Sequence, residues 1–219
     1  EYIIIDGASS DGTQEFLSTL TPEIKWISEK DRGISHAFNK GLSKVTGDRV
    51  LCLNSGDVFV SSKTIESIWN ILGNSRKDIV SFKVQVDNNT FIPAKDDESW
   101  VWDTCNEPHQ GTFVAKKIYD KVGGYSEEYK IRMDYHFFAR CRKHHATFSF
   151  FHDVIVKYEP GGVSMRKENR IGFWGEGLSV KVLYDLKITM KDILKLVIYR
   201  RGYLYGEHSN SHLHNCNGN

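Results

Sequence analysis

Over its first third, the chain alternates between short apolar runs and segments with helical spacing. The runs at residues 2–6, 24–27 and 49–54 have the length and the continuous apolar character of buried strands. Residues 34–45 carry apolar side chains at helical spacing, and Gly47 follows where a helix would end. Strands that alternate with helices predict an α/β fold, with a mostly parallel sheet flanked by helices. In such folds, ligands bind where loops leave the carboxyl ends of the strands.

The rest of the chain continues this pattern less regularly. Further strands are expected at residues 79–86 and 147–158, and further helices at residues 61–72, 116–122, 133–143 and 190–201. The polar stretch 87–108 has few periodic features, and we interpret it as an active-site loop. The expected organisation is a binding and catalytic unit over 1–164, a helical extension over 165–205 and a disordered tail over 206–219.

The composition of the chain argues against a nucleic-acid-binding protein, a disulfide-rich protein and a membrane-spanning protein. The 219 residues include 29 Lys+Arg and 28 Asp+Glu, a formal net charge of +1, so no overall charge favours nucleic-acid binding. Four cysteines lie far apart without a CxxC pair, which is typical of reduced thiols and a cytoplasmic location. No apolar run approaches the roughly 20 residues of a membrane-spanning helix. We therefore expect a soluble protein, or one that lies peripherally on the inner face of the plasma membrane.

Two loops that follow predicted strands contain acidic and small residues. The first, DGASSDGT, begins at Asp6, whose carboxylate can accept a hydrogen bond from a base or a ribose; an ordinary turn has the same composition. The second, LNSGD, ends at Asp57, a hard oxygen ligand for Mg²⁺ or Mn²⁺. Its neighbours Asn54, Ser55 and Gly56 are left for diphosphate oxygens. A capped turn before the next helix explains this loop equally well.

Two further positions carry charges suited to binding or catalysis. Asp31 and Arg32 follow the second predicted strand, where a guanidinium is available to a nucleotide, although a surface ion pair is the commoner use. Asp134 lies at the start of a predicted helix and can take a proton from an attacking hydroxyl; helix capping is the alternative.

Taken in order, five segments of the chain resemble the GT-A domain of family 2 glycosyltransferases, in particular the bacterial exopolysaccharide and colanic-acid-type branch. The five segments are IIIDGASSDGT at 3–13, DRGISHAFNKGLSKVTGDRVLCLNSGD at 31–57, HQGTF at 109–113, GGYSEEYKIRMDYHFFAR at 123–140 and GGVS at 161–164. The resemblance implies a Rossmann-like GT-A fold with a C-terminal helical extension. It also implies an inverting enzyme that transfers sugar from a nucleotide-sugar donor during synthesis of bacterial surface polysaccharides.

The resemblance assigns roles to individual residues. It implies that Asp6 contacts the base or ribose, Arg32 the nucleotide, and Asp57 the diphosphate and a Mn²⁺ or Mg²⁺ ion. Asp134 matches the family's catalytic base. The donor would be a UDP-sugar, and the acceptor a saccharide or a lipid-linked saccharide. His109 and Gln110 would line the acceptor side.

The chain also departs from the family pattern. Asn54 and Gly56 stand where many relatives have acids, Gly7 replaces a common Asp, and Met133 precedes Asp134 where Glu is usual. No QxxRW motif follows, which argues against a processive synthase. The strand, turn and helix that open the family's domain are expected before residue 2, so the sequence reads as lacking that first unit.

Two other functions are compatible with this pattern. A non-catalytic nucleotide-sugar or carbohydrate binding module would keep the fold but leave the donor intact. A sugar-nucleotide pyrophosphorylase is disfavoured because its Gly-rich basic phosphate loop is not found in the sequence. Near the end of the chain, lysines and arginines lie among apolar residues over 187–201, which predicts either a helix on a membrane surface or a last helix packed on the domain.

Overall fold

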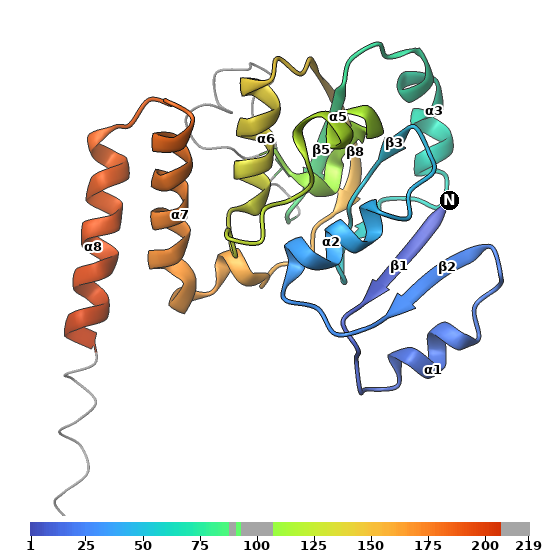
Figure 1. The fold of residues 1–219 in the computed structure, drawn as a ribbon, viewed down its shortest axis with the longest axis horizontal. Coiled ribbons are helices and arrows are strands. Elements are labelled where there is room, and N and C mark those ends of the chain that lie inside the picture. Colours follow the sequence, from blue (N-terminus) through green and yellow to red (C-terminus); the bar gives the residue numbers. More distant parts are fainter. Residues whose placement is uncertain (88–90, 93–106, 207–219) are drawn as a thin grey trace, which may run out of the picture.

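The computed structural model describes residues 1–87, 91–92 and 107–206 as an α/β protein whose helices flank a central sheet (Figure 1). The strands are β1 (Tyr2–Asp6), β2 (Ile24–Ser28), β3 (Arg49–Val50), β4 (Val58–Phe59), β5 (Ile79–Gln85), β6 (Phe91–Ile92), β7 (Thr112–Ala115) and β8 (Phe148–Lys157). The α-helices are α1 (Thr13–Ser18), α2 (Ile34–Leu42), α3 (Thr64–Asn74), α5 (Lys116–Val122), α6 (Met133–Lys143), α7 (Arg170–Leu183) and α8 (Met190–Gly206). Three single 3₁₀ turns complete the described elements: η1 (His109–Gly111), η2 (Val163–Met165) and η3 (Lys167–Asn169).

The strands form two sheets in the described part of the chain. β1 and β2 pair in parallel as a two-stranded sheet, with Tyr2 opposite Ile24 and Asp6 opposite Ser28. The larger sheet has the order β3-β7-β5-β8-β4, and β6 pairs with β5. β5 and β8 form the one parallel pair of this sheet among the described strands. β7 pairs antiparallel with both β3 and β5, and β4 and β6 pair antiparallel with β8 and β5. The α/β fold is therefore confirmed, but the sheet is mixed rather than mostly parallel.

β5 is the centre of the core because its two faces are buried by different helices. Successive side chains of a strand point to opposite faces, so Ile79 and Val80 enter separate clusters. On one face, Ile79 packs with α5 and α6 through residues such as Phe137. On the other face, Val80 packs with α3 through Ile68. The continuous apolar run predicted as a buried strand is thus explained by cover on both sides.

Most of the expected helices and strands agree with the structure to within a few residues at their ends. The helices expected at 116–122 and 133–143 have those limits in α5 and α6. The expected helix 34–45 ends earlier, at Leu42, with Ser43 as its C-cap, and only Arg49 and Val50 of the expected strand 49–54 pair in a sheet. Most of the expected active-site loop 87–108, and residues 207–219 of the expected tail, lie outside the described residues.

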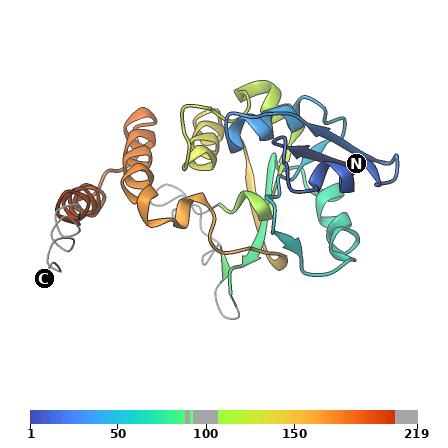
Figure 2. The same cartoon turned by 90° about the horizontal axis from the view of Figure 1, so that it is seen from below.

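The C-terminal segment is packed against the domain through α7. α7 and α8 lie side by side, and α6 separates α7 from the sheet (Figures 1 and 2). Val180 of α7 and Leu186 after it join the buried cluster that contains Phe137. None of the helices among the described residues is both long enough and apolar enough to cross a membrane.

Two of the four cysteines lie among the described residues, and both are free thiols. Burial raises the pKa of Cys52 to about 12, and it also raises the pKa of Cys141 well above its ordinary value. Both thiols therefore stay protonated at neutral pH and act as small apolar side chains.

Candidate functional site

The loop between β3 and β4 holds a carboxylate in a fixed orientation. Asp57 accepts one backbone N–H on each oxygen, from Asn54 on Oδ2 at 3.3 Å and from Glu159 on Oδ1 at 3.1 Å. Gly56 has a φ of 93°, and a Cβ at this position would lie 2.9 Å from the Glu159 side chain. Glycine is therefore required here. Ser55 is exposed at the tip of the turn.

The turn η1 brings a histidine against this loop. Nδ2 of Asn54 lies 3.0 Å from Nε2 of His109. Because an amide nitrogen only donates, Nε2 accepts, and the neutral ring carries its proton on Nδ1. Gly111 allows η1 to lie close against β5, since a Cβ there would lie 2.7 Å from the carbonyl oxygen of Phe82. Gln110 is buried beside His109 in the same turn.

Asp134 lies in the first turn of α6 and faces the histidine. Its Oδ2 is 3.8 Å from Nδ1 of His109, and its Oδ1 accepts the backbone N–H of Tyr135 at 2.7 Å. Burial opposes ionisation, but the interactions with His109, the charge of Arg132 and the Tyr135 N–H outweigh it, so the pKa of Asp134 is lowered. The carboxylate is ionised at neutral pH, and 29% of its side chain remains exposed. It is chemically able to accept a proton.

These contacts connect four residues that are far apart in the sequence. The line runs from the Asp57 carboxylate to the Asn54 backbone, from the Asn54 amide to His109, and from the other nitrogen of His109 to Asp134. The structure thus brings the predicted metal ligand, one predicted acceptor-side residue and the predicted base into one site.

Asp6 and Asp31 form a second group at the carboxyl end of β1. Asp6 is 8% exposed and accepts hydrogen bonds from Ser28 Oγ at 2.6 Å and from the backbone N–H of Ser9 at 3.0 Å. These bonds lower the pKa of Asp6, the Ser28 bond most of all. A Cβ on Gly7 would lie 2.8 Å from Asp31 Oδ2. A second Asp at this position, which the family pattern favours, would therefore require the Asp31 side chain to shift.

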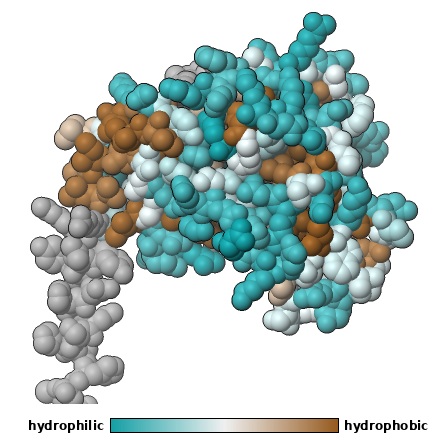
Figure 3. Space-filling view, in the orientation of Figure 1, coloured by the Kyte–Doolittle hydropathy of each residue, from teal (hydrophilic) through white to brown (hydrophobic). Residues whose placement is uncertain are grey.

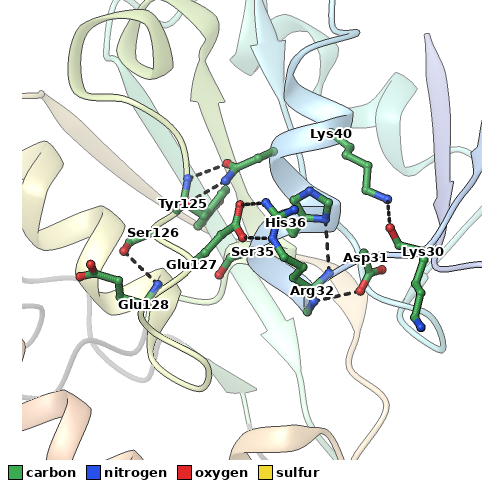
Figure 4. Close-up of polar contacts among 12 residues, drawn as sticks. Lys30, Asp31, Arg32, Ser35, His36, Lys40, Tyr125, Ser126, Glu127 and Glu128 are labelled. Carbon is green, nitrogen blue, oxygen red and sulfur yellow. Dashed lines mark hydrogen bonds and ion pairs between the residues drawn. The ribbon is translucent and has the colours of Figure 1, made fainter.

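Arg32 lies next to this group, and its guanidinium is paired with a residue that the sequence analysis did not single out. Nε and Nη2 of Arg32 donate to the two carboxylate oxygens of Glu127 at 2.8 and 3.0 Å (Figure 4). The hydrogen bond raises the pKa of Arg32 and lowers that of Glu127. The pair joins two loops whose residues are 95 positions apart. Arg32, expected to contact the nucleotide, is here held by a carboxylate.

A second pair of hydrogen bonds holds the Glu127 loop against α2. The side-chain amide of Asn39 donates to the carbonyl oxygen of Tyr125 at 2.7 Å and accepts the Tyr125 N–H at 2.8 Å (Figure 4). Asn39 and Glu127 both lie within segments that carry the family resemblance, at 31–57 and 123–140. Nothing local in either segment pairs them with residues of the other, so these roles were not predicted.

The donor set at Asp57 fits a divalent cation that is shared with a ligand. Among the described residues, no group of three or more His, Cys, Asp or Glu side chains is arranged to hold a metal. Each oxygen of Asp57 accepts only one N–H, which leaves a lone pair on both. Mg²⁺ is commonly held by one or two carboxylates with phosphate oxygens and water completing the shell. Asp57 fits that arrangement, and a cage formed by protein ligands alone is not present among the described residues.

Comparison with known proteins finds proteins that are similar in sequence and others that are similar in fold. A PGL/p-HBAD biosynthesis glycosyltransferase of Mycobacterium bovis is 26% identical over 173 residues, which cover 75% of this chain and 67% of that protein. The crystal structure of S. aureus TarS 1-349 in complex with UDP-GlcNAc has a TM-score of 0.65 at 14% identity, covering 97% of this chain and 67% of that one.

A third relative shares the fold at a similar level. The mannosyltransferase PcManGT from Pyrobaculum calidifontis, in complex with GDP-Man and Mn²⁺, has a TM-score of 0.60 at 14% identity, covering 96% of this chain and 67% of that one. This chain therefore spans about two thirds of the length of each of these relatives. At these identities, the two solved structures support the fold alone.

The model of glycosyl transferase family 2 matches residues 1–143, which include the Asp57 loop, η1 and Asp134. The match spans well over half of the chain. The protein belongs to glycosyl transferase family 2.

Proposed function

We propose that the protein is an inverting, metal-dependent glycosyltransferase that transfers a sugar from a nucleotide-sugar donor to a saccharide or lipid-linked saccharide in bacterial surface polysaccharide synthesis. The observation that carries the proposal is the line of contacts from Asp57 through Asn54 and His109 to Asp134. It joins a carboxylate suited to the donor diphosphate to a carboxylate suited to the acceptor hydroxyl. Displacement at one carbon requires both groups at neighbouring positions.

The donor would be held by the two acidic groups. Asp6 and Asp31 would contact the base and ribose, and Asp57 would hold Mn²⁺ or Mg²⁺ together with the diphosphate. When bound, the ion would supply positive charge that stabilises the departing nucleotide. UDP-GlcNAc and GDP-Man in the two related structures support a nucleotide-sugar donor. Of these two nucleotides, we favour UDP.

Asp134 would act on the acceptor. Its ionised carboxylate would take the proton of an acceptor hydroxyl, the hydroxyl oxygen would form a bond to the anomeric carbon, and the nucleoside diphosphate would leave with the electron pair of the broken bond. Attack from the face opposite the leaving group inverts the configuration. His109 would orient Asp134, since its Nδ1 lies 3.8 Å from Oδ2 while Asn54 holds its other nitrogen. Gln110 would line the acceptor side.

The outer face of α8 is apolar, which is unusual for a helix on a protein surface. Its side chains at i, i+3, i+4, i+7 and i+8 are all exposed: Met190, Ile193, Leu194, Val197 and Ile198. We call this set the α8 stripe. Val182 and Leu183 at the end of α7 are exposed as well, and Figure 3 shows apolar side chains gathered over these helices.

The opposite face of α8 carries polar groups that pack against α7. Asp192 pairs with Lys181 of α7 at 2.9 Å, and Lys195 lies 4.0 Å from the ring centroid of Trp174. Exposed Lys187 and Lys191 flank the α8 stripe. An apolar stripe beside lysines matches a bilayer surface with anionic headgroups. We therefore include in the proposal a peripheral contact between α8 and an anionic membrane, which would bring the site near a lipid-linked acceptor.

A donor-consumption assay tests the central proposal. The full chain is incubated with UDP-GlcNAc or GDP-mannose and Mn²⁺, with and without saccharide acceptors, and released nucleoside diphosphate is measured. We expect release that increases with acceptor for one donor class. A thermal-shift screen of UDP-, GDP- and dTDP-sugars identifies the donor beforehand, because a ligand that binds the native state raises its stability. A chain that binds a donor and leaves it intact with every acceptor would instead be a binding module.

A further inference from the structure

The helix α7 holds the stretch of backbone that leads into α6. The carboxylate of Glu176 accepts three consecutive backbone N–H groups, from Lys130 on Oε1 at 3.0 Å and from Ile131 and Arg132 on Oε2 at 2.9 and 2.8 Å. Three donors on one carboxylate fix both the position and the direction of this backbone. Asp134 lies two residues further along the chain.

Glu176 places a carboxylate beside the N-terminal end of α6 and accepts the N–H of its N-cap residue. The N-cap residue of α6 is Arg132, and it makes no side-chain cap hydrogen bond. The first N–H groups of a helix have no partner within the helix, and an anion near them is favourable. Here the anion comes from another helix, 44 residues away in the sequence.

The face of α7 that carries Glu176 packs closely against residues 131–132. A Cβ on Gly172 would lie 2.8 Å from Cδ1 of Ile131, so the two segments touch closely there. The ring centroid of Phe173 lies 4.3 Å from the guanidinium carbon of Arg132, and Gly177 faces the same guanidinium. Positions 172, 173, 176 and 177 share one side of a helix. The contact is therefore formed by a whole face of α7 rather than by one side chain.

We propose that Glu176 is a positioning residue for Asp134: by holding residues 130–132, it fixes the first turn of α6 and so sets the carboxylate of Asp134 against His109 and the acceptor hydroxyl. This inference rests on the proposed function of Asp134 as the base. It gives the C-terminal extension a part in the reaction, although the extension lies beyond the family match at 1–143. A base displaced by about 1 Å loses up to about a hundredfold in rate.

Steady-state kinetics of two variants test the proposal. Glu176→Ala removes all three acceptor contacts, and we expect kcat for transfer to fall by about tenfold to a hundredfold while the donor KM stays within about twofold. Glu176→Gln keeps one acceptor oxygen and should fall between the parent and the Ala variant. Asp192→Asn is the matched control, since Asp192 accepts hydrogen bonds from Lys181 of α7 and from Thr189 and, within the described part of the chain, none from α6. It should leave kcat unchanged.

A double variant separates positioning from general stability. If Glu176 acts through Asp134, adding Glu176→Ala to Asp134→Asn costs little beyond Asp134→Asn alone, because the base is already lost. A parent-like kcat in both Glu176 variants, or a loss that multiplies with that of Asp134→Asn, overturns the inference. The assignment of Asp134 as the base is tested separately. It fails if the single Asp134→Asn variant, with Glu176 intact, transfers sugar at the parent rate.

Discussion

The side-chain amide of Asn54 donates to Nε2 of His109 at 3.0 Å, so that the proton of the neutral ring lies on Nδ1, 3.8 Å from Asp134. Asn54 stands where many members of the family carry an acid. An acid at this position would accept from Nε2 and reverse the ring's tautomer. Asn54 thus links the Asp57 loop to Asp134 through the orientation of His109.

Removing this amide is expected to slow transfer. Asn54→Ala leaves the His109 ring without its fixed partner, and we expect kcat to fall by about tenfold, because the ring then turns away from Asp134 in part of the population. Asn74→Ala, the same substitution at the exposed end of α3, is the matched control and should match the parent. Equal transfer rates for the two variants would contradict the role of Asn54 in orienting His109.

Asp57 is expected to govern metal-dependent donor binding. Asp57→Asn keeps an oxygen that can accept one of the two backbone N–H groups, so the loop should keep its shape while the negative charge is lost. In calorimetric titrations, donor affinity in the presence of Mn²⁺ should fall to the level measured without Mn²⁺. Unchanged affinity with Mn²⁺ would show that the ion is held elsewhere or is not required.

Glu127 is expected to compete with the donor for Arg32. Its carboxylate occupies the Nε–Nη2 edge of the guanidinium, in the bidentate arrangement that a phosphate also adopts. Glu127→Gln should therefore lower the donor KM severalfold. The melting temperature should change little, because the pair is exposed. Glu128→Gln is the exposed neighbouring control, and a donor KM that rises in the Glu127 variant would contradict the competition.

The α8 stripe is expected to bind anionic membranes. The parent should float with phosphatidylglycerol vesicles and not with phosphatidylcholine vesicles, since both apolar burial and lysine charge contribute. Replacing Leu194 and Val197 with Ser should abolish flotation, whereas Val58→Ser, an exposed apolar position in β4, should not. The membrane contact would be contradicted if the parent did not float with vesicles. If the parent instead formed dimers and the Ser variants were monomers, the α8 stripe would be the contact with a second copy of the chain.

The helices and the site loops could be predicted from the sequence because their signals are local. The limits of α5 and α6 follow from apolar spacing within the segments themselves. The mixture of parallel and antiparallel strands could not be predicted, because it depends on β7 pairing with both β3 and β5, which lie far from it in the sequence. Strands as short as β3 and β4 carry too few residues for a period to be visible.

The positions of the candidate site residues were predicted, but their partners were not. Asp57 and Asp134 could be singled out because each lies within a short sequence motif that resembles the family. Glu127 and Glu176 act on residues 95 and 44 to 46 positions away, and nothing in their neighbouring sequence indicates such a contact. An acidic residue on a helix or a loop is most often simply solvated, so only the folded chain distinguishes these two from the rest.

The rate of sugar transfer by Asp134→Asn tests the account most directly. Asn keeps the shape of Asp and its hydrogen bond to the Tyr135 N–H but accepts no proton. We predict an unchanged melting temperature, unchanged affinity for donor and Mn²⁺, and transfer slower by about a hundredfold or more, the usual range for a general base. The lowered pKa of Asp134 predicts that the parent keeps its base ionised down to mildly acidic pH. Transfer by the Asn variant at the parent rate would contradict the assignment of Asp134 and the mechanism built on it.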